Sequence, residues 1–213
     1  MISIETFTFN DFQENTYVLH DETKECIIVD PGCYSQLEKD QLLNYINNND
    51  LKPVRLINTH CHIDHVLGNK FVSECWGLDL EAHEQDLPTL QAVTQYSSLY
   101  GFHNYEESPL PLHFLNEGDL VSFGQSYLTI MFTPGHAPGH IVLYSKEQDF
   151  VIGGDVLFQM SIGRTDLPGG DHQTLINSIK NKLMPLEDKT KVYCGHGPYT
   201  TVGFERKNNP FLN

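Results

Sequence analysis

The stretch Thr59-His60-Cys61-His62-Ile63-Asp64-His65 places three histidines and one aspartate within six consecutive positions. On an extended backbone the rings of His60 and His62, two positions apart, point to the same side. A tight turn after Ile63 would bring Asp64 and His65 toward the same point. Imidazole nitrogens and carboxylate oxygens are the ligands that a borderline divalent cation such as zinc accepts. The stretch therefore predicts a metal site.

The residues before this stretch predict that it lies at the end of a buried strand. Val54, Leu56 and Ile57 form an apolar run, and ligands in open α/β sheets bind at the C-terminal ends of the strands. The alternative, a run of surface or tautomer-paired histidines, leaves this apolar run unexplained. A helix expected from Asp64 to about Cys75 would put Asp64 at the positive end of the helix dipole, where an ionised carboxylate is favoured.

Composition and charge limit the classes of function. The 213 residues correspond to one domain, and the 39% apolar content is enough for a core. A net charge of −15 argues against nucleic acid as a partner, because phosphate would be repelled. We expect no signal peptide and no membrane span, since no long apolar run is present. The five cysteines form no Cys-x-x-Cys pair, which favours reduced thiols and a cytoplasmic protein.

Periodicity in the rest of the chain predicts strands that alternate with helices. Short apolar and β-branched runs predict strands at 3–9, 16–20, 26–30, 119–123, 127–132, 141–144, 150–152 and 191–194. Ser35 and Glu38 form a capping-box pattern before an apolar helical stripe. Further helices are expected at 84–100, as one helix or as two broken by Pro88, at 174–183, and from Thr200 to about Asn208. This order favours an α/β fold in which helices cover two packed sheets, a four-layer arrangement.

Three predicted strands of the second half end in residues that can add to the metal site. His136 follows one strand in the turn Thr133-Pro134-Gly135-His136. Asp155 follows two glycines after the next buried strand, and His196 lies in Gly195-His196-Gly197-Pro198 after the last. Proline and glycine make tight turns there and let the backbone come close. Each turn alone is a weak signal, but together with the first stretch they indicate one larger site.

The number of candidate ligands predicts two metal ions. The seven candidates are His60, His62, Asp64, His65, His136, Asp155 and His196. A typical catalytic site for a single zinc uses three protein ligands, so we expect two ions ~3.5–4 Å apart that share one carboxylate. Two cations that share a water lower its pKa toward neutrality and provide hydroxide. The expected reaction class is metal-assisted hydrolysis.

The remaining histidines are expected to be structural. His140, four residues after His136, is expected to support the ligands or the fold. Cys61 lies between two candidate ligands, but strand alternation points it away from them. The histidines without the flanking pattern are His20, His83, His103, His113 and His172.

The candidate ligands resemble, in order, those of the metallo-β-lactamase superfamily, whose hallmark is His-x-His-x-Asp-His followed by a separate His, an Asp and a last His. The resemblance covers nearly the whole chain, and it implies an αββα sandwich with a single hydrolase domain over 1–213. It also implies that His60, His62 and His136 bind a first metal ion. Asp64, His65 and His196 would then bind a second, and Asp155 would bridge the two.

Within that superfamily the chain looks like the short, single-domain bacterial branch of glyoxalase II-like proteins (hydroxyacylglutathione hydrolases). The segments Gly154–Phe158 and Gly163–Asp171 carry this likeness. The common zinc β-lactamases place a Cys in the second metal site, where Asp155 stands here. The helical C-terminal domain that holds glutathione in the full-length enzyme is not expected here. The turn Ile162-Gly163-Arg164 also replaces the Cys-Gly-(Lys/Arg) of the thiol-substrate groups.

The resemblance implies thioester hydrolysis, with S-lactoylglutathione as the type of substrate and a metal-bridging hydroxide as the nucleophile. The metals are expected to be two Zn²⁺, with Fe or Mn as alternatives, and Asp64 would orient the attacking hydroxide. Arg164 can clamp a substrate carboxylate by two hydrogen bonds, or it can pair with Asp166 or Asp171 instead. The expected partner is a small-molecule thioester, with neither nucleic acid nor membrane, and the oligomeric state is left open.

Three other functions stay open at this point. One is a mononuclear iron persulfide dioxygenase that would use His60, His136 and Asp155. Another is a superfamily hydrolase of a lactone, a β-lactam or a phosphodiester. The third, from a different class, is a non-enzymatic metal-binding or redox-signalling protein.

Overall fold

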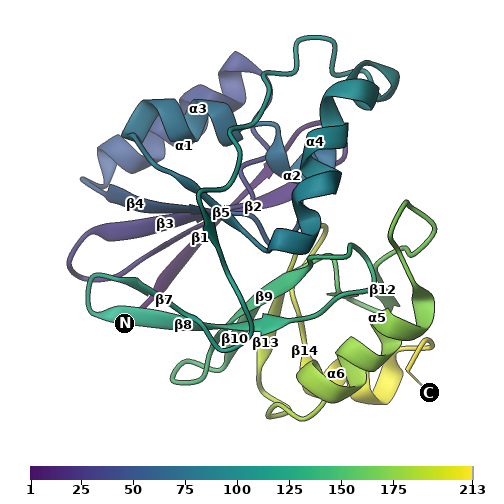
Figure 1. The fold of residues 1–213 in the computed structure, drawn as a ribbon. Helices are drawn as coiled ribbons and strands as arrows, with labels where there is room; N and C mark the ends of the chain where they lie inside the picture. Colours follow the sequence, from purple (N-terminus) through teal and green to yellow (C-terminus); the bar gives the residue numbers. More distant parts are fainter. Residues whose placement is uncertain (213) are drawn as a thin grey trace. The chain divides into compact units, whose positions relative to one another are not determined.

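The computed structural model describes residues 1–212, which form two compact units. The first unit comprises residues 1–114 and 122–126, and the second comprises 115–121 and the described residues from 127 onward. A six-stranded sheet organises each unit, and helices accompany each sheet (Figure 1).

The sheet of the first unit has the strand order β1-β2-β3-β4-β5-β6. Its strands are β1 (Ser3–Phe9), β2 (Glu14–His20), β3 (Glu25–Val29), β4 (Lys52–Ile57), β5 (Leu80–Ala82) and β6 (His113–Phe114). β1, β2 and β3 pair antiparallel, with Phe7 opposite Thr16. β3, β4, β5 and β6 pair in parallel, so their C-terminal ends lie along one edge of the sheet.

Helices of the first unit bury their apolar stripes in a single core. Leu42 and Ile46 of α1 (Gln36–Asn48) pack there with Val72 of α3 (Asn69–Trp76). Leu90 and Val93 of α4 (Leu87–Tyr96) belong to the same core. The predicted capping box of α1 is confirmed, since Ser35 Oγ accepts from Glu38 N and Glu38 Oε2 accepts from Ser35 N.

One helical prediction in the first unit is wrong, and the structure decides between the alternatives of a second. The helix expected from Asp64 to Cys75 is divided into α2 (Ile63–Val66) and α3. At the division Gly68 N donates to Pro31 O at 2.7 Å, and a Cβ on Gly68 would lie 2.4 Å from Cys33 Sγ. The segment expected over 84–100 is helical throughout, as a 3-10 turn (Glu84–Asp86), α4 and a second 3-10 turn (Ser97–Tyr100). Pro88 does not interrupt α4, because it stands in the first turn, where its missing N–H costs nothing.

The other six-stranded sheet, most of whose residues belong to the second unit, has the strand order β14-β13-β10-β9-β8-β7. Its strands are β7 (Leu120–Phe123), β8 (Ser126–Phe132), β9 (Ile141–Ser145), β10 (Phe150–Gly154), β13 (Lys191–Cys194) and β14 (Thr200–Thr201). β10 and β13 pair in parallel, whereas β8, β9 and β10 pair antiparallel. β11 (Leu157–Phe158) and β12 (Ser161–Ile162) form a separate small hairpin.

The helix predicted over 174–183 is an α-helix that changes into a π-helical turn. α5 (His172–Ser178) begins after its N-cap Asp171, whose side chain accepts from Thr174 N, and the π-helical segment η3 (Ile179–Leu183) follows. Leu175, Ile179 and Leu183 are buried together in the core of this unit. The predicted C-terminal helix is confirmed as α6 (Val202–Asn208).

The structure tests the predicted absence of a membrane span for helices only. Within residues 1–212, no helix combines the length and the apolar character needed to cross a bilayer.

Candidate metal centre

The first cluster (His60, His62, Asp64 and His65) forms where β4 ends, within the first unit. The chain leaves β4 at Ile57, turns, and enters α2 at Ile63. The ring centroids of His60 and His62 lie 4.8 Å apart, and those of His60 and His65 lie 4.1 Å apart. His65 Nε2 lies 3.6 Å from Asp64 Oδ2. These four side chains therefore converge as predicted, but Asp64 and His65 reach the cluster from a short helix that begins at Ile63, not from a tight turn after Ile63.

Asp30 orients the first cluster from behind. Its Oδ1 accepts from Thr59 N at 2.7 Å and its Oδ2 accepts from Thr59 Oγ1 at 2.5 Å. His65 Nδ1 lies 3.1 Å from Asp30 Oδ2. A carboxylate only accepts, so Nδ1 of His65 carries the proton and Nε2 is the nitrogen that can coordinate a metal.

Asp30 also lies close enough to His60 and His65 to be considered as a candidate metal ligand. Ligand atoms of Asp30, His60 and His65 all lie within 4.8 Å of one another. Both of its oxygens are already engaged by Thr59 and by the Nδ1 side of His65, so Asp30 supports the cluster instead. From the sequence, Asp30 is expected only as the end of a strand. An acidic residue directly after a buried strand, the same signal as at Asp155, could have identified it.

Glu14 adds a second buried carboxyl group behind the first cluster. Glu14 is 0% exposed, and its Oε1 lies 3.9 Å from His65 Nδ1. Thr16 Oγ1 donates to its Oε2 at 2.9 Å. Burial raises the pKa of Glu14 well above its usual value, because the charged form loses its hydration. Glu14 is not among the candidates from the sequence, since nothing in its sequence neighbourhood shows that it faces the histidines.

Asn10 joins the turn between β1 and β2 to the first cluster. Its Nδ2 donates to both Gly32 O and Asp64 O at 3.0 Å. Gly32 has no room for a side chain, because a Cβ there would lie 2.1 Å from Glu14 Oε2 and 2.6 Å from Asp64 O. The main chain at Asp64 is therefore held between a side-chain amide and a closely packed glycine.

The second cluster (His136, Asp155 and His196) lies within the second unit. Asp155 directly follows β10, His136 lies in the turn after β8, and His196 follows β13. Asp155 Oδ2 lies 3.5 Å from His136 Nε2 and also 3.5 Å from His196 Nε2. One carboxylate oxygen thus faces two imidazole nitrogens at equal distance.

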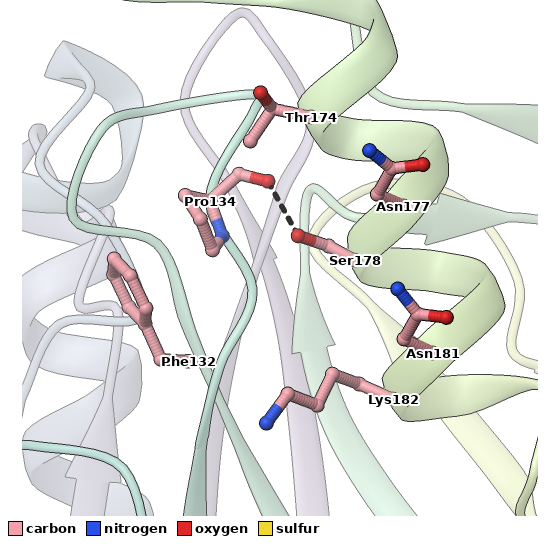
Figure 2. Close-up of a pocket in the computed structure, with 7 residues that line it drawn as sticks. All are labelled: Phe132, Pro134, Thr174, Asn177, Ser178, Asn181 and Lys182. Carbon is pink, nitrogen blue, oxygen red and sulfur yellow. Dashed lines mark hydrogen bonds between the residues drawn. The ribbon is translucent and has the colours of Figure 1, made fainter.

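Helix α5 supports the turn that carries His136. Gly135 has φ +130°, and a Cβ on it would lie 2.2 Å from Leu175 N, so only glycine fits. Gly135 O accepts from Asp171 N at 2.8 Å. Ser178 Oγ donates to Pro134 O at 2.7 Å, the bond drawn in Figure 2. The hollow in that view lies beside this turn, and its lining residues are Phe132, Pro134, Thr174, Asn177, Ser178, Asn181 and Lys182.

Main-chain contacts fix the other members of the second cluster. His136 Nδ1 lies 2.7 Å from Arg164 O, and because a carbonyl only accepts, Nε2 of His136 is the nitrogen that can coordinate. Asp155 N donates to His140 Nε2 at 3.0 Å. His140 is 0% exposed and therefore positions Asp155 through its backbone, in agreement with its expected supporting role.

Arg164 forms an ion pair with Asp166. Arg164 Nε and Nη2 donate to the two oxygens of Asp166 at 2.7 and 2.8 Å. The side-chain hydrogen bond from Arg164 lowers the pKa of Asp166 to about 2. Both side chains are largely exposed, at 61% and 68%. Of the two roles open for Arg164 in the sequence, the structure contains the pairing with Asp166.

Cys61 packs away from the first cluster, as strand alternation predicts. It is buried in the core of the first unit, and its main-chain N donates to Asp86 Oδ2 at 2.6 Å. Burial raises the pKa of its thiol well above the usual value, so the neutral form persists. Among the histidines expected to be structural, His83 is buried and accepts from Gln85 N through Nδ1.

The two clusters consist of imidazole nitrogens and carboxylate oxygens, which are the donors that Zn²⁺, Fe²⁺ and Mn²⁺ accept. In both clusters a histidine Nδ1 is occupied by an oxygen acceptor, which is the usual arrangement behind metal-binding histidines. The chain therefore carries histidine and aspartate groups able to bind metal.

Comparisons with known proteins agree with this chemistry. A family model described as "Metallo-beta-lactamase superfamily" matches residues 9–196. The hydroxyacylglutathione hydrolase GloC of Haemophilus influenzae is 37% identical over 217 residues, which span 100% of this chain and 99% of that protein.

Two solved structures are also similar over almost their full length. The BLEG-1 B3 metallo-beta-lactamase has a TM-score of 0.90 and 35% identity, covering 99% of this chain and 100% of that one. TTHA1623 in a di-iron-bound form has a TM-score of 0.87 and 36% identity, covering 98% and 100%. These likenesses confirm the α/β fold type that the motifs predict.

Proposed function

This chain is a metallo-hydrolase of the metallo-beta-lactamase superfamily, and from that premise we propose that it hydrolyses a thioester at a centre of two divalent metal ions. The proposed ligands are the members of the two clusters. We assign His60, His62 and His136 to one ion, Asp64, His65 and His196 to the other, and Asp155 to both.

One observation carries the bridging role of Asp155. A single oxygen of this carboxylate lies 3.5 Å from the Nε2 atoms of both His136 and His196, and these two histidines belong to different ions in the assignment. A carboxylate shared in this way is the usual bridge of a two-metal hydrolase. The main-chain bond from Asp155 N to His140 holds this carboxylate in place.

When bound, the two ions would supply hydroxide at neutral pH and polarise the substrate carbonyl. The residues of the chain do the rest. Asp64, held through its carbonyl by Asn10, orients the attacking oxygen as the catalytic residue of the proposal. Asp30 keeps the proton of His65 on Nδ1. The leaving thiol has a pKa of about 8.5, so no strong general acid is needed.

The relative named hydroxyacylglutathione hydrolase supports a thioester of the S-lactoylglutathione type as the substrate. We propose Arg164 as a contact for a carboxylate of the thiol carrier, a role in which the carboxylate would replace Asp166. We propose that residues 1–213 form one hydrolase domain that acts on small molecules in the cytosol. The five cysteines are free thiols, which supports that compartment.

Zn²⁺ is the proposed metal, with Fe and Mn as alternatives, since a relative was solved in a di-iron form. The decisive experiment is metal analysis of protein purified without added metal, followed by a thioester panel on the same sample. We expect about two ions per chain and release of free thiol from S-lactoylglutathione or a related thioester. One iron per chain, with oxygen uptake on glutathione persulfide, would instead establish the persulfide dioxygenase.

A second candidate function, β-lactam hydrolysis, is supported by the similarity to the BLEG-1 B3 metallo-beta-lactamase. A chromogenic cephalosporin added to the same panel separates the two candidates. A higher kcat/KM on the cephalosporin than on every thioester would replace the thioester proposal.

A further inference from the structure

Five aromatic side chains of the first unit form a continuous group, here called the aromatic shelf. Its members are Phe12, Tyr34, Tyr96, Tyr100 and Phe102. The ring centroids of Phe12 and Tyr100 lie 6.0 Å apart, and those of Phe12 and Phe102 lie 5.7 Å apart. Phe102 also meets Tyr34 at 5.0 Å, and Tyr96 meets Tyr100 at 5.6 Å. These separations are those of interacting aromatic pairs.

Hydrogen bonds attach the aromatic shelf to the first cluster. Asn10 Nδ2 donates to Asp64 O, and Asn10 Oδ1 accepts from Phe12 N, each at 3.0 Å. One amide side chain therefore connects the main chain of Asp64 to that of Phe12. The other end of the shelf is attached through α4, which packs against α2 and ends at Tyr96 (Figure 1).

The rings of the aromatic shelf differ in their exposure to solvent. Phe102 is 3% exposed and belongs to the core, whereas Phe12 is 41% and Tyr100 is 48% exposed. Large aromatic rings that remain half-exposed beside a catalytic centre offer apolar surface to a ligand. No member of the shelf is a cation, so the shelf offers no counter-charge to an anionic group.

The second cluster has an aromatic neighbour as well. The ring of Phe158 lies 6.2 Å from that of His196, centroid to centroid. Met160, two residues along the same small hairpin, is 45% exposed. Arg164, the cation nearest to this hairpin in the sequence, already pairs with Asp166. Both clusters are therefore bordered by apolar side chains.

We infer that the aromatic shelf binds an apolar, preferably aromatic, acyl group of the thioester substrate. This inference rests on the proposed function and extends it, because it names the chemical class of the acyl group. Ring-on-ring contact with Phe12 and Tyr100 would orient the acyl chain while its carbonyl lies at the metal ligands. An aryl-alkanoyl thioester is then a better substrate than an acetyl thioester of the same thiol.

The test compares two thioesters of N-acetylcysteamine, one with a 3-phenylpropionyl group and one with an acetyl group. For the metal-loaded protein we expect the ratio of the two kcat/KM values to favour 3-phenylpropionyl by about ten-fold. Phe12→Ala and Tyr100→Ala should each remove most of this preference, and Phe12→Leu should keep part of it. Leu99→Ala is the matched control, because Leu99 is 85% exposed on the same short helix as Tyr100 and has no place in the shelf.

A binding measurement separates failure of this inference from failure of the proposed function. Calorimetric titration with 3-phenylpropionate and with propionate needs no turnover, and we expect only the aromatic acid to bind more weakly to Phe12→Ala. If no thioester is cleaved but this difference is present, the proposed function is wrong, and the shelf binds an aromatic group of a substrate that is not a thioester. If thioesters are cleaved with equal kcat/KM and both acids bind Phe12→Ala as they bind the unmodified protein, the shelf is wrong and the proposed function stands.

Discussion

The first cluster takes its four side chains from the six residues 60–65, whereas the second takes its three from separate turns at positions 136, 155 and 196. Side chains support the first cluster: Asp30 holds His65, and Asn10 holds Asp64. In the second, the side chain of His140 holds the main-chain N of Asp155, but the imidazole of His136 is held by the main-chain O of Arg164. The imidazole of His65 should therefore respond to a side-chain substitution behind it, and that of His136 to changes of backbone geometry.

The largest expected effect is at Asp155, the centre of the second cluster. Asp155→Ala removes the oxygen that faces both His136 and His196. We expect both metal ions to be lost and activity to fall by roughly 10³-fold or more, because the ligand that we propose the two ions share is missing. Metal content per chain and kcat measure this. Full metal content with full activity in Asp155→Ala would show that the bridging assignment is wrong.

The dependence of the second cluster on its backbone can be tested at Gly135. Gly135→Ala combines a φ of +130° with a Cβ only 2.2 Å from Leu175 N. We expect the free energy of unfolding to fall by about 2–4 kcal/mol. Gly118→Ala is the matched control, because Gly118 has φ +85° with nothing within 4 Å of a Cβ. Gly118→Ala should lower the free energy of unfolding by only about 1 kcal/mol. If denaturant titrations give the same decrease for Gly118→Ala and Gly135→Ala, the close contact with Leu175 is not the cause.

The dependence of the first cluster on side chains can be tested at Asp30. Asp30→Asn replaces an acceptor of the His65 Nδ1–H by an amide, and we expect metal affinity to fall by about 10–100-fold. Arg164→Ala is the counterpart in the second unit. It should leave metal affinity unchanged, since His136 is held by the main-chain oxygen of residue 164. Competition with a chromogenic chelator measures the metal affinity of both variants. An equal loss of affinity in Asp30→Asn and Arg164→Ala would show that the two clusters do not differ in this way.

A smaller effect is expected at Asp21, which connects the β2–β3 turn to the segment 122–126 within the first unit. Burial raises the pKa of Asp21, but hydrogen bonds from Thr23, Gln125 and Ser126 outweigh it and lower the pKa from 3.8 to about 2. A pKa lower in the folded than in the unfolded state adds stability above about pH 4, and this stability is lost as the pH falls toward 2. Asp21→Asn should therefore reduce the free energy of unfolding by about 1–2 kcal/mol at pH 7.

The pH dependence distinguishes this effect from simple loss of packing. The difference between Asp21→Asn and the unmodified protein should shrink between pH 4 and pH 2, as measured by denaturant titration. Asp166→Asn is a useful control, because Asp166 has a pKa of about 2 as well but is exposed in its pair with Arg164. A difference for Asp21→Asn that stays constant with pH would mean that the ionised carboxylate is not the cause.

Much of the fold could be predicted because its signals are local. The capping box at Ser35 and Glu38, the strand at 191–194 and the helix near the C-terminus all lie where periodicity and capping residues indicate. The helix expected over 64–75 is interrupted near Gly68, because the main chain there is held by its contacts with Pro31 and Cys33. The π-helical turn at 179–183 likewise has no signal in the apolar spacing of that segment.

By itself, the sequence determined the types of the candidate ligands, the convergence of His60 to His65, and the superfamily, because these depend on short spacings and on residue chemistry. Only the tertiary structure revealed Asn10, Glu14 and Asp30 as supports of the first cluster, and the equal distances from Asp155 to His136 and His196. The physical reason is how far apart in the sequence the contacting residues lie. A turn or a cap forms between neighbouring residues, whereas these contacts join strands and turns whose proximity depends on the packing of the whole sheet.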